Sequence, residues 1–174
     1  ARVQVFDSLS ASIGLGMQVR RAVDLANNGA SAQDIVQTLT AERTFYHLLF
    51  FADTLEFLHR GGRIGKASQL VGSILKIKPL LLCKQGEVVP LERTRNRSRA
   101  IQGLIDYARR FASIDALSIL HDGTDSDDVE HIKAELADIV PPESVIVSVY
   151  GPIIATHVGP GALGLCLRTK EAEA

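Results

Sequence analysis

The chain has 174 residues, 46% of them hydrophobic, which is enough to bury a core in one domain or in one domain plus part of another. Its 19 basic and 20 acidic residues leave a formal net charge of −1, so no overall field favours nucleic acid or an anionic membrane surface. No apolar run approaches the roughly 20 residues of a membrane-spanning helix. We therefore expect a soluble globular protein without membrane insertion.

Residues 3–6 (VQVF) predict a strand that ends in a serine-rich turn. A helix should follow, because apolar residues recur there at helical spacing: Val19, Ala22, Val23 and Ala26. Gly29 suits the position after this helix, and Ser31 with Asp34 has the spacing of a capping box that opens a second helix through about Ala41.

The middle of the chain predicts a strand over residues 45–53, a short helix stopped by Gly61 and Gly62, and another helix over residues 66–75. Residues 77–94 (IKPLLLCKQGEVVPLERT) then predict two strands joined by a tight turn at Gln85 and Gly86. An antiparallel hairpin is implied.

The last third predicts a helix over residues 97–111, a strand ending at His121, a helix over residues 127–139 and a strand over residues 144–150. Strands that alternate with helices favour an α/β fold, and the hairpin makes the sheet mixed. Cys83 and Cys166 lie in apolar runs without C-x-x-C spacing, which predicts reduced thiols buried in strands and a cytoplasmic location.

Three glycines, Gly159, Gly161 and Gly164, formally match the dinucleotide fingerprint G-x-G-x-x-G. We reject the match because only ten residues follow it, too few for the helix, strand and acidic residue that the fingerprint needs. No metal site is expected either, since the five histidines share no close ligand spacing and the two cysteines lie far apart in the sequence.

His157 stands in the stretch ATHVGPGALGLCL, where glycines leave room for another group to approach the backbone. It is either a core histidine with one backbone partner or a donor to an anionic or carbonyl oxygen. The stretch DSLSASIGLG (residues 7–16) is either an ordinary capped helix start or a place where amides and hydroxyls bind an anion.

Basic residues are concentrated between His59 and Arg99, a segment with ten Lys or Arg and two acids. Arg60 and Arg63 flank a glycine pair, and the stretch RTRNRSR begins at Arg93. A solvated basic surface is the simplest interpretation. Nucleic acid is not expected, because aromatic side chains for base stacking are few.

Five motifs in order, DSLSASIGLG, DTLEFLHRGGRIG, LKIKPLL, GEVVPLERTR and THVGPGALGL, make the chain similar to the DegV family of bacterial fatty-acid-binding proteins. The resemblance covers nearly the whole chain. It implies a two-lobed α/β fold related to the dihydroxyacetone-kinase substrate domain, with a long acyl chain buried between the lobes. Residues 1–43 would be a remnant of the N-terminal lobe, the rest of which is missing, and residues 44–174 the C-terminal lobe.

The resemblance also implies the site. His157 would donate to the fatty-acid carboxylate, and Ile153, Ile154 and Leu163 would suit the tunnel wall. The other implied ligand-binding residues are Gly159, Gly161, Arg63, Ser8 and Ser12. Arginines near the pocket mouth would dock a fatty acid kinase subunit that phosphorylates the carboxylate: Arg60, Arg93 and Arg95.

The expected function is a non-enzymatic acyl carrier, with a fatty acid as ligand and no cofactor. Two alternatives stay open on the sequence. The first is an enzyme or enzyme subunit in phosphoryl transfer, suggested by the kinase-domain kinship and the basic segment. The second is a regulatory module whose basic face binds an acidic protein.

Overall fold

The computed structural model describes residues 3–70, 77–124 and 126–170. Within them, six strands form one mixed sheet: β1 (Tyr46–Phe51), β2 (Lys78–Lys84), β3 (Glu87–Thr94), β4 (Ile114–His121), β5 (Ile146–Val149) and β6 (Leu163–Thr169). Their spatial order is β3-β2-β1-β6-β4-β5. The α/β fold with a mixed sheet predicted from the sequence is therefore confirmed.

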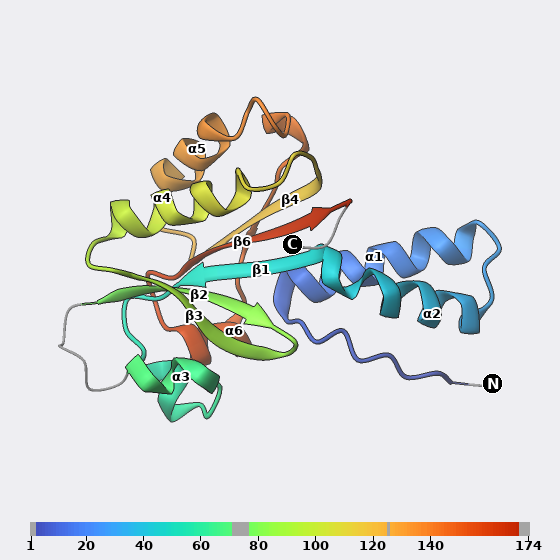
Figure 1. The fold of residues 1–174 in the computed structure, drawn as a ribbon, viewed down its shortest axis with the longest axis horizontal. Helices are drawn as coiled ribbons and strands as arrows, with labels where there is room; N and C mark the ends of the chain where they lie inside the picture. The colour runs from blue at the N-terminus through green and yellow to red at the C-terminus, as the bar shows by residue number, and fades with distance from the viewer. Residues whose placement is uncertain (1–2, 71–76, 125, 171–174) are drawn as a thin grey trace.

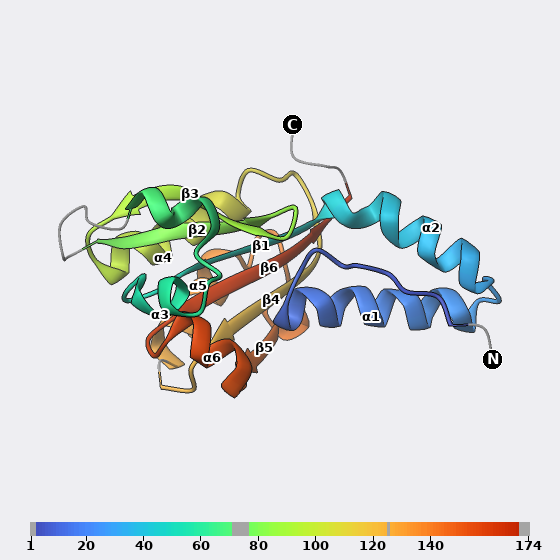
Figure 2. The ribbon, with the colours of Figure 1, turned by 90° about the horizontal axis from the view of Figure 1, so that it is seen from below.

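Helices flank the sheet on both faces. The helices α4 (Arg97–Ala108) and α5 (Ser126–Glu135) cover one face, while α3 (Glu56–Arg60) and α6 (Pro152–Val158) lie on the other (Figure 1 and Figure 2). Short 3-10 helices occur as well: Arg43–Phe45, Gly65–Leu70 and Pro142–Ser144. The functional question concerns the face of α3 and α6.

Four of the five strand pairings among these residues are antiparallel, and β4 pairs with β5 in parallel. The hairpin predicted between β2 and β3 is confirmed, and its turn residues Gln85 and Gly86 both have positive φ, 53° and 79°. Two consecutive positive φ values match the twist of the flanking strands, and glycine reaches this region without strain.

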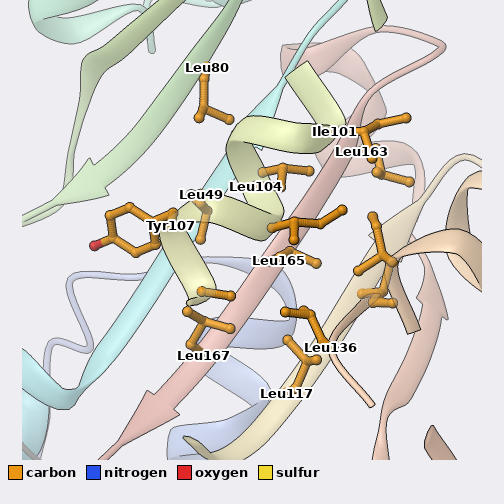
Figure 3. Close-up of a cluster of buried hydrophobic side chains, with 14 of the residues drawn as sticks. Leu49, Leu80, Ile101, Leu104, Tyr107, Leu117, Leu136, Leu163, Leu165 and Leu167 are labelled. Carbon is orange, nitrogen blue, oxygen red and sulfur yellow. The ribbon is translucent and has the colours of Figure 1, made fainter. Parts of the chain in front are cut away.

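The main core lies between the sheet and α4. On β1, His47, Leu49 and Phe51 are buried, while the residues between them face the opposite side. Figure 3 shows Leu104 and Tyr107 of α4 over these strands. His47 belongs to this core and both ring nitrogens have partners: the Tyr107 hydroxyl at 3.2 Å from Nδ1 and Thr169 Oγ1 at 3.3 Å from Nε2.

Two helices, α1 (Ser12–Asn27) and α2 (Ala32–Glu42), form a hairpin that projects beyond the end of the sheet (Figure 1). Gly29 makes the turn with φ of +85°, and Ser31 and Asp34 form the predicted capping box. The hairpin is tied to the sheet through Glu42, which pairs with Arg21 at 2.7 Å and with Arg168 of β6 at 3.4 Å.

Three expectations about the elements need correction. Residues 3–6 are irregular and not a strand, because no strand in the described ranges pairs with their backbone, and Val3 and Val5 are 84% and 89% exposed. The helix predicted over residues 127–139 ends at Glu135 and continues only as turns. Of the helix predicted over residues 66–75, the described part is a 3-10 helix, and residues 71–75 lie outside the described ranges.

Candidate functional site

An apolar cavity of about 140 Å³ lies on the face of the sheet that carries α3 and α6. Strand residues form its floor, and α3, α6 and the start of α1 surround it. Gly164 of β6 contributes no side chain to this floor, and a Cβ there would approach the Leu49 carbonyl oxygen and Phe50 Cβ to 3.0 Å. The apolar lining consists of Leu48, Phe50, Leu58, Val88, Leu120, Ile154, Val158, Ala162 and Leu163.

Polar groups enter the same cavity wall at a few positions. Arg63 is exposed and its guanidinium donates to the Gly61 carbonyl at 3.0 Å. Ser12 is the first residue of α1, and the N-cap residue before it is Ala11. Alanine has no side-chain acceptor, so no side-chain hydrogen bond caps this helix. The positive end of the α1 dipole, without a side-chain acceptor at the cap, therefore lies at the cavity.

His157 lies in the last turn of α6 and lines the cavity. Its Nδ1 atom is buried and has no hydrogen-bond partner among the described residues, whereas both nitrogens of His47 in the core are paired. The Nδ1 edge of the ring packs on Gly61, where any Cβ would overlap it. Such a buried unpaired nitrogen is uncommon in native proteins, because leaving it without a partner costs free energy.

A glycine turn directly after His157 connects α6 to β6. Gly159 has φ of +73° and Gly161 has φ of +74°, a region that side chains other than glycine enter only with strain. A Cβ at Gly159 would overlap the Phe57 ring, and one at Gly161 would lie 2.9 Å from Asp53 Oδ2. Both glycines are therefore required by close approach as well as by backbone conformation.

Three side chains from other elements hold this turn. The Tyr150 hydroxyl donates to the Gly159 carbonyl at 2.7 Å, and Asp122 Oδ2 accepts from the Gly161 amide at 2.8 Å. The Arg97 guanidinium donates to the Gly161 carbonyl at 2.7 Å. The position of His157 relative to the sheet is consequently fixed by bonds to both glycines.

Electrostatic interactions strengthen the hydrogen bond from the Gly161 amide to Asp122. Burial alone would raise the pKa of the Asp122 carboxyl, but hydrogen bonds from Thr124 and from the Gly161 amide, with the charge of Arg97, hold it below its usual value. Arg97 also pairs with Asp128 at 2.6 Å. Asp122 is therefore an anionic acceptor for the turn at neutral pH.

The predicted ligand-binding residues divide between several places. His157, Arg63 and Ser12 line the apolar cavity together. Ser8 lines a second, more polar cavity that shares Leu48 and Cys83 with the first. Gly159 and Gly161 form the anchored turn and do not belong to either lining.

The arginines expected to dock a partner are all exposed. Arg60 forms an ion pair with Glu56 of the same helix at 2.6 Å. Arg93 and Arg95 lie at the end of β3, and neither has a carboxylate within ion-pair distance in the described part of the chain. Much of the basic segment is neutralised by acids instead, as in the pairs Lys66–Glu87 and Arg97–Asp128.

The expected tunnel wall is partly wrong. Ile154 and Leu163 line the cavity, but Ile153 is 78% exposed. Ile154, His157 and Val158 have the i, i+3, i+4 spacing of one face of α6 and line the cavity, and Ile153 lies outside that set. Both thiols belong to strands as predicted, with Cys166 fully buried and Cys83 half-buried at the cavity.

Sequence reasoning missed Tyr150, Asp122 and Arg97. Each belongs to a different element, and their shared target is a pair of backbone groups, so no spacing rule connects them. One signal was present: Asp122 directly follows β4 in the stretch HDGT, and polar residues at strand ends are common at functional sites of α/β proteins.

Residues 3–70, 77–124 and 126–170 contain no group of three His, Cys, Asp or Glu placed to hold a metal ion. In the same ranges, no helix combines the length and apolarity needed to cross a membrane.

Comparison with known proteins gives a consistent family. A family model described as "uncharacterised protein, DegV family" matches residues 1–170. A DegV domain-containing protein of Deinococcus radiodurans is 36% identical over 98% of this chain. The chain covers 62% of that relative and so spans about three fifths of its length.

Solved structures agree. A DegV family protein from Thermus thermophilus, whose structure is described as fatty acid binding, has a TM-score of 0.86 at 36% identity. DegV from Bacillus subtilis, described as a fatty acid binding protein, has a TM-score of 0.77 at 30% identity. Each match covers 97% of this chain and 61% of the solved chain. With a family match over residues 1–170 and relatives that keep the same fold, the chain belongs to the DegV family.

Proposed function

We propose that this protein binds a long-chain fatty acid, holding part of the acyl chain in the apolar cavity and the carboxylate beside His157, without catalysis of its own. The observation that carries the proposal is an apolar cavity whose wall brings together a histidine and an arginine, His157 and Arg63. The solved relatives described as fatty acid binding support it.

The energetics favour such a ligand. A cavity of about 140 Å³ is close to the roughly 150 Å³ that holds benzene in an engineered protein, so it accommodates about six carbons. Six buried methylenes at about 0.8 kcal/mol each contribute about 5 kcal/mol. The carboxylate requires donors, because burying an unpaired charge is costly.

His157 and Arg63 would supply the donors. The Nδ1 edge of the His157 ring packs on Gly61, so Nε2 is the nitrogen we assign to the carboxylate. The Ser12 hydroxyl and the start of α1 would add to the positive environment. Ser8, in the second cavity, would contact the ligand only beyond the apolar cavity.

We also propose that residues 1–43 belong to a second lobe and residues 44–174 to the cavity-bearing lobe. The hairpin of α1 and α2 projects from the sheet, and α1 exposes an apolar stripe of Leu15, Val19 and Val23, at 43%, 54% and 51% exposure. Such a stripe fits a surface covered by further chain, as the greater length of the relatives allows.

The function proposed for the exposed arginines is docking of a fatty acid kinase subunit, which would transfer a phosphoryl group to the bound carboxylate. Arg60, Arg93 and Arg95 offer charge for an acidic partner surface. The two free thiols, Cys83 and Cys166, support a cytoplasmic setting for this exchange.

The test compares hexadecanoate binding by the wild-type gene product that carries these residues with binding by a His157→Ala variant. Losing one hydrogen bond to a charged group costs about 1.5–3 kcal/mol, so affinity should fall about 10-fold to 100-fold. His131→Ala is the matched control, since His131 is exposed on α5 across the sheet. Equal affinities of both variants would remove His157 from the site.

A further inference from the structure

The second cavity, with a volume of about 540 Å³, begins where the apolar cavity ends. It lies between the segment before α1, the end of α2 and the first residues of β1. The two linings share two residues, Leu48 of β1 and Cys83 of β2. The border between the cavities is therefore made by these two side chains.

The sheet register shows how the cavities follow each other. On this face of β1, Phe50, Leu48 and Tyr46 succeed one another at intervals of two residues, about 7 Å apart. Phe50 lines only the apolar cavity, Tyr46 only the second, and Leu48 both. The two cavities thus follow one line along β1, about 14 Å from the first of these side chains to the last.

Cys83 lies opposite Leu48 in the register of β1 and β2. Leu9 covers it from above: the Cys83 thiol lies 3.9 Å from the Leu9 carbonyl oxygen, and Leu9 has a positive φ of 52°. Leu9 and Cys83 approach each other closely at the border between the two cavities. Because the cysteine side chain is small, it does not close the border.

The volume of the first cavity makes this border important. Space for about six carbons cannot hold a chain of sixteen, so the distal carbons of such a ligand must leave the first cavity. The shared wall gives them a path into a space almost four times as large. The lining of that space is mixed, with apolar residues such as Leu9 and Leu48 and polar residues such as Gln18 and Arg43.

We propose that the second cavity receives the distal carbons of the acyl chain and that residue 83 sets the chain length the protein accepts. This inference rests on the fatty-acid binding proposed above. Shorter acids would occupy the first cavity alone and would meet residue 83 only as part of its wall. Longer acids would pass between Leu48 and Leu9 and would depend on it.

The experiment measures binding of octanoate and hexadecanoate to wild-type protein, Cys83→Phe and the near-isosteric control Cys83→Ser. Because residue 83 lines both cavities, we expect Cys83→Phe to lower hexadecanoate affinity at least tenfold more than it lowers octanoate affinity, and Cys83→Ser to keep both affinities. If Cys83→Phe keeps hexadecanoate affinity, or loses both acids equally, the inference is wrong and fatty-acid binding stands. Wild-type protein that binds neither acid overturns the proposed function, and the inference with it.

A second measurement tests whether the acyl chain enters the second cavity, even if Cys83→Phe fails to fold. Ser10 lines the second cavity and not the first, so Ser10→Cys, in a background of Cys83→Ser and Cys166→Ser, places a single thiol there. Hexadecanoate should slow its reaction with N-ethylmaleimide at least tenfold, and octanoate should not. Equal reaction rates with the two acids would contradict passage into the second cavity.

Discussion

Tyr150→Phe should destabilise the protein through the glycine turn that holds His157. The substitution keeps the ring at the cavity wall and removes only the hydroxyl, which donates to the buried Gly159 carbonyl at 2.7 Å. Leaving a buried acceptor unpaired costs about 1–3 kcal/mol. For a chain of this size each kcal/mol lowers the melting temperature by roughly 2–4 °C, so a loss of about 2 kcal/mol predicts a decrease of roughly 4–8 °C.

Thermal and urea unfolding, followed by circular dichroism, measure this loss directly. The matched control is Tyr46→Phe, because the buried Tyr46 hydroxyl interacts only weakly with Arg168 in the described part of the chain, so its removal should cost less than removal of the Tyr150 hydroxyl. Hexadecanoate affinity of Tyr150→Phe should also fall, since His157 lies two residues before the released carbonyl. Equal melting temperatures for Tyr150→Phe and wild-type protein would refute the assigned role of the hydroxyl.

Three further predictions concern the same face of the sheet. Gly159→Ala should lower the melting temperature and weaken hexadecanoate binding in a titration, because the new Cβ overlaps the Phe57 ring at a strained φ. If the melting temperature and the affinity both stay at their wild-type values, the turn is not constrained at this position. Gly164→Val should reduce hexadecanoate binding by filling the cavity floor, and calorimetry that finds the full wild-type affinity would contradict the position of the ligand. Burial raises the pKa of the Cys166 thiol to about 12, whereas the pKa of a thiol in the unfolded chain is near 8.5. The thiol therefore stabilises the fold fully at pH values below about 8.5, and this contribution to stability is lost as the pH rises toward 12. Urea unfolding at pH 8 and pH 11 should show this decrease, and Cys166→Ala should reduce it; an equal decrease in both proteins would assign the effect to other groups.

Local signals predicted the elements well where the elements depend on local chemistry. The capping box of Ser31 and Asp34 and the hairpin turn at Gln85 and Gly86 need only nearby residues, and both are present. The segment of residues 3–6 has strand-like composition, but a strand also needs a partner, and none pairs with it in the described residues. Pairing is a property of the whole fold and leaves little trace in a four-residue segment.

The candidate site was predictable in part for the same reason. Glycines around His157 indicated close backbone packing, which the structure shows against Phe57 and Gly61. The roles of Tyr150 and Asp122 as partners of the turn could not be predicted, because both bind backbone atoms that are distant in sequence; only the position of Asp122 at the end of β4 was a signal. The cavity itself depends on which strand residues share a face, and that follows only from the register.

Two histidines in apolar stretches show what the sequence alone does not predict, namely whether a buried ring nitrogen has a hydrogen-bond partner. His47 and His157 both lie among hydrophobic residues, and no feature of either stretch states whether the ring is paired. In the fold, a tyrosine and a threonine satisfy His47, while His157 Nδ1 has no partner. The difference arises from residues more than 50 positions away in sequence for His47, so it belongs to tertiary structure.

Native mass spectrometry of the purified gene product that contains residues 1–174 would show whether this protein carries a fatty acid. We expect a complex with one bound molecule per chain, which denaturation releases and extraction identifies as a long-chain fatty acid. A protein that is purified empty and takes up no added hexadecanoate would contradict the account.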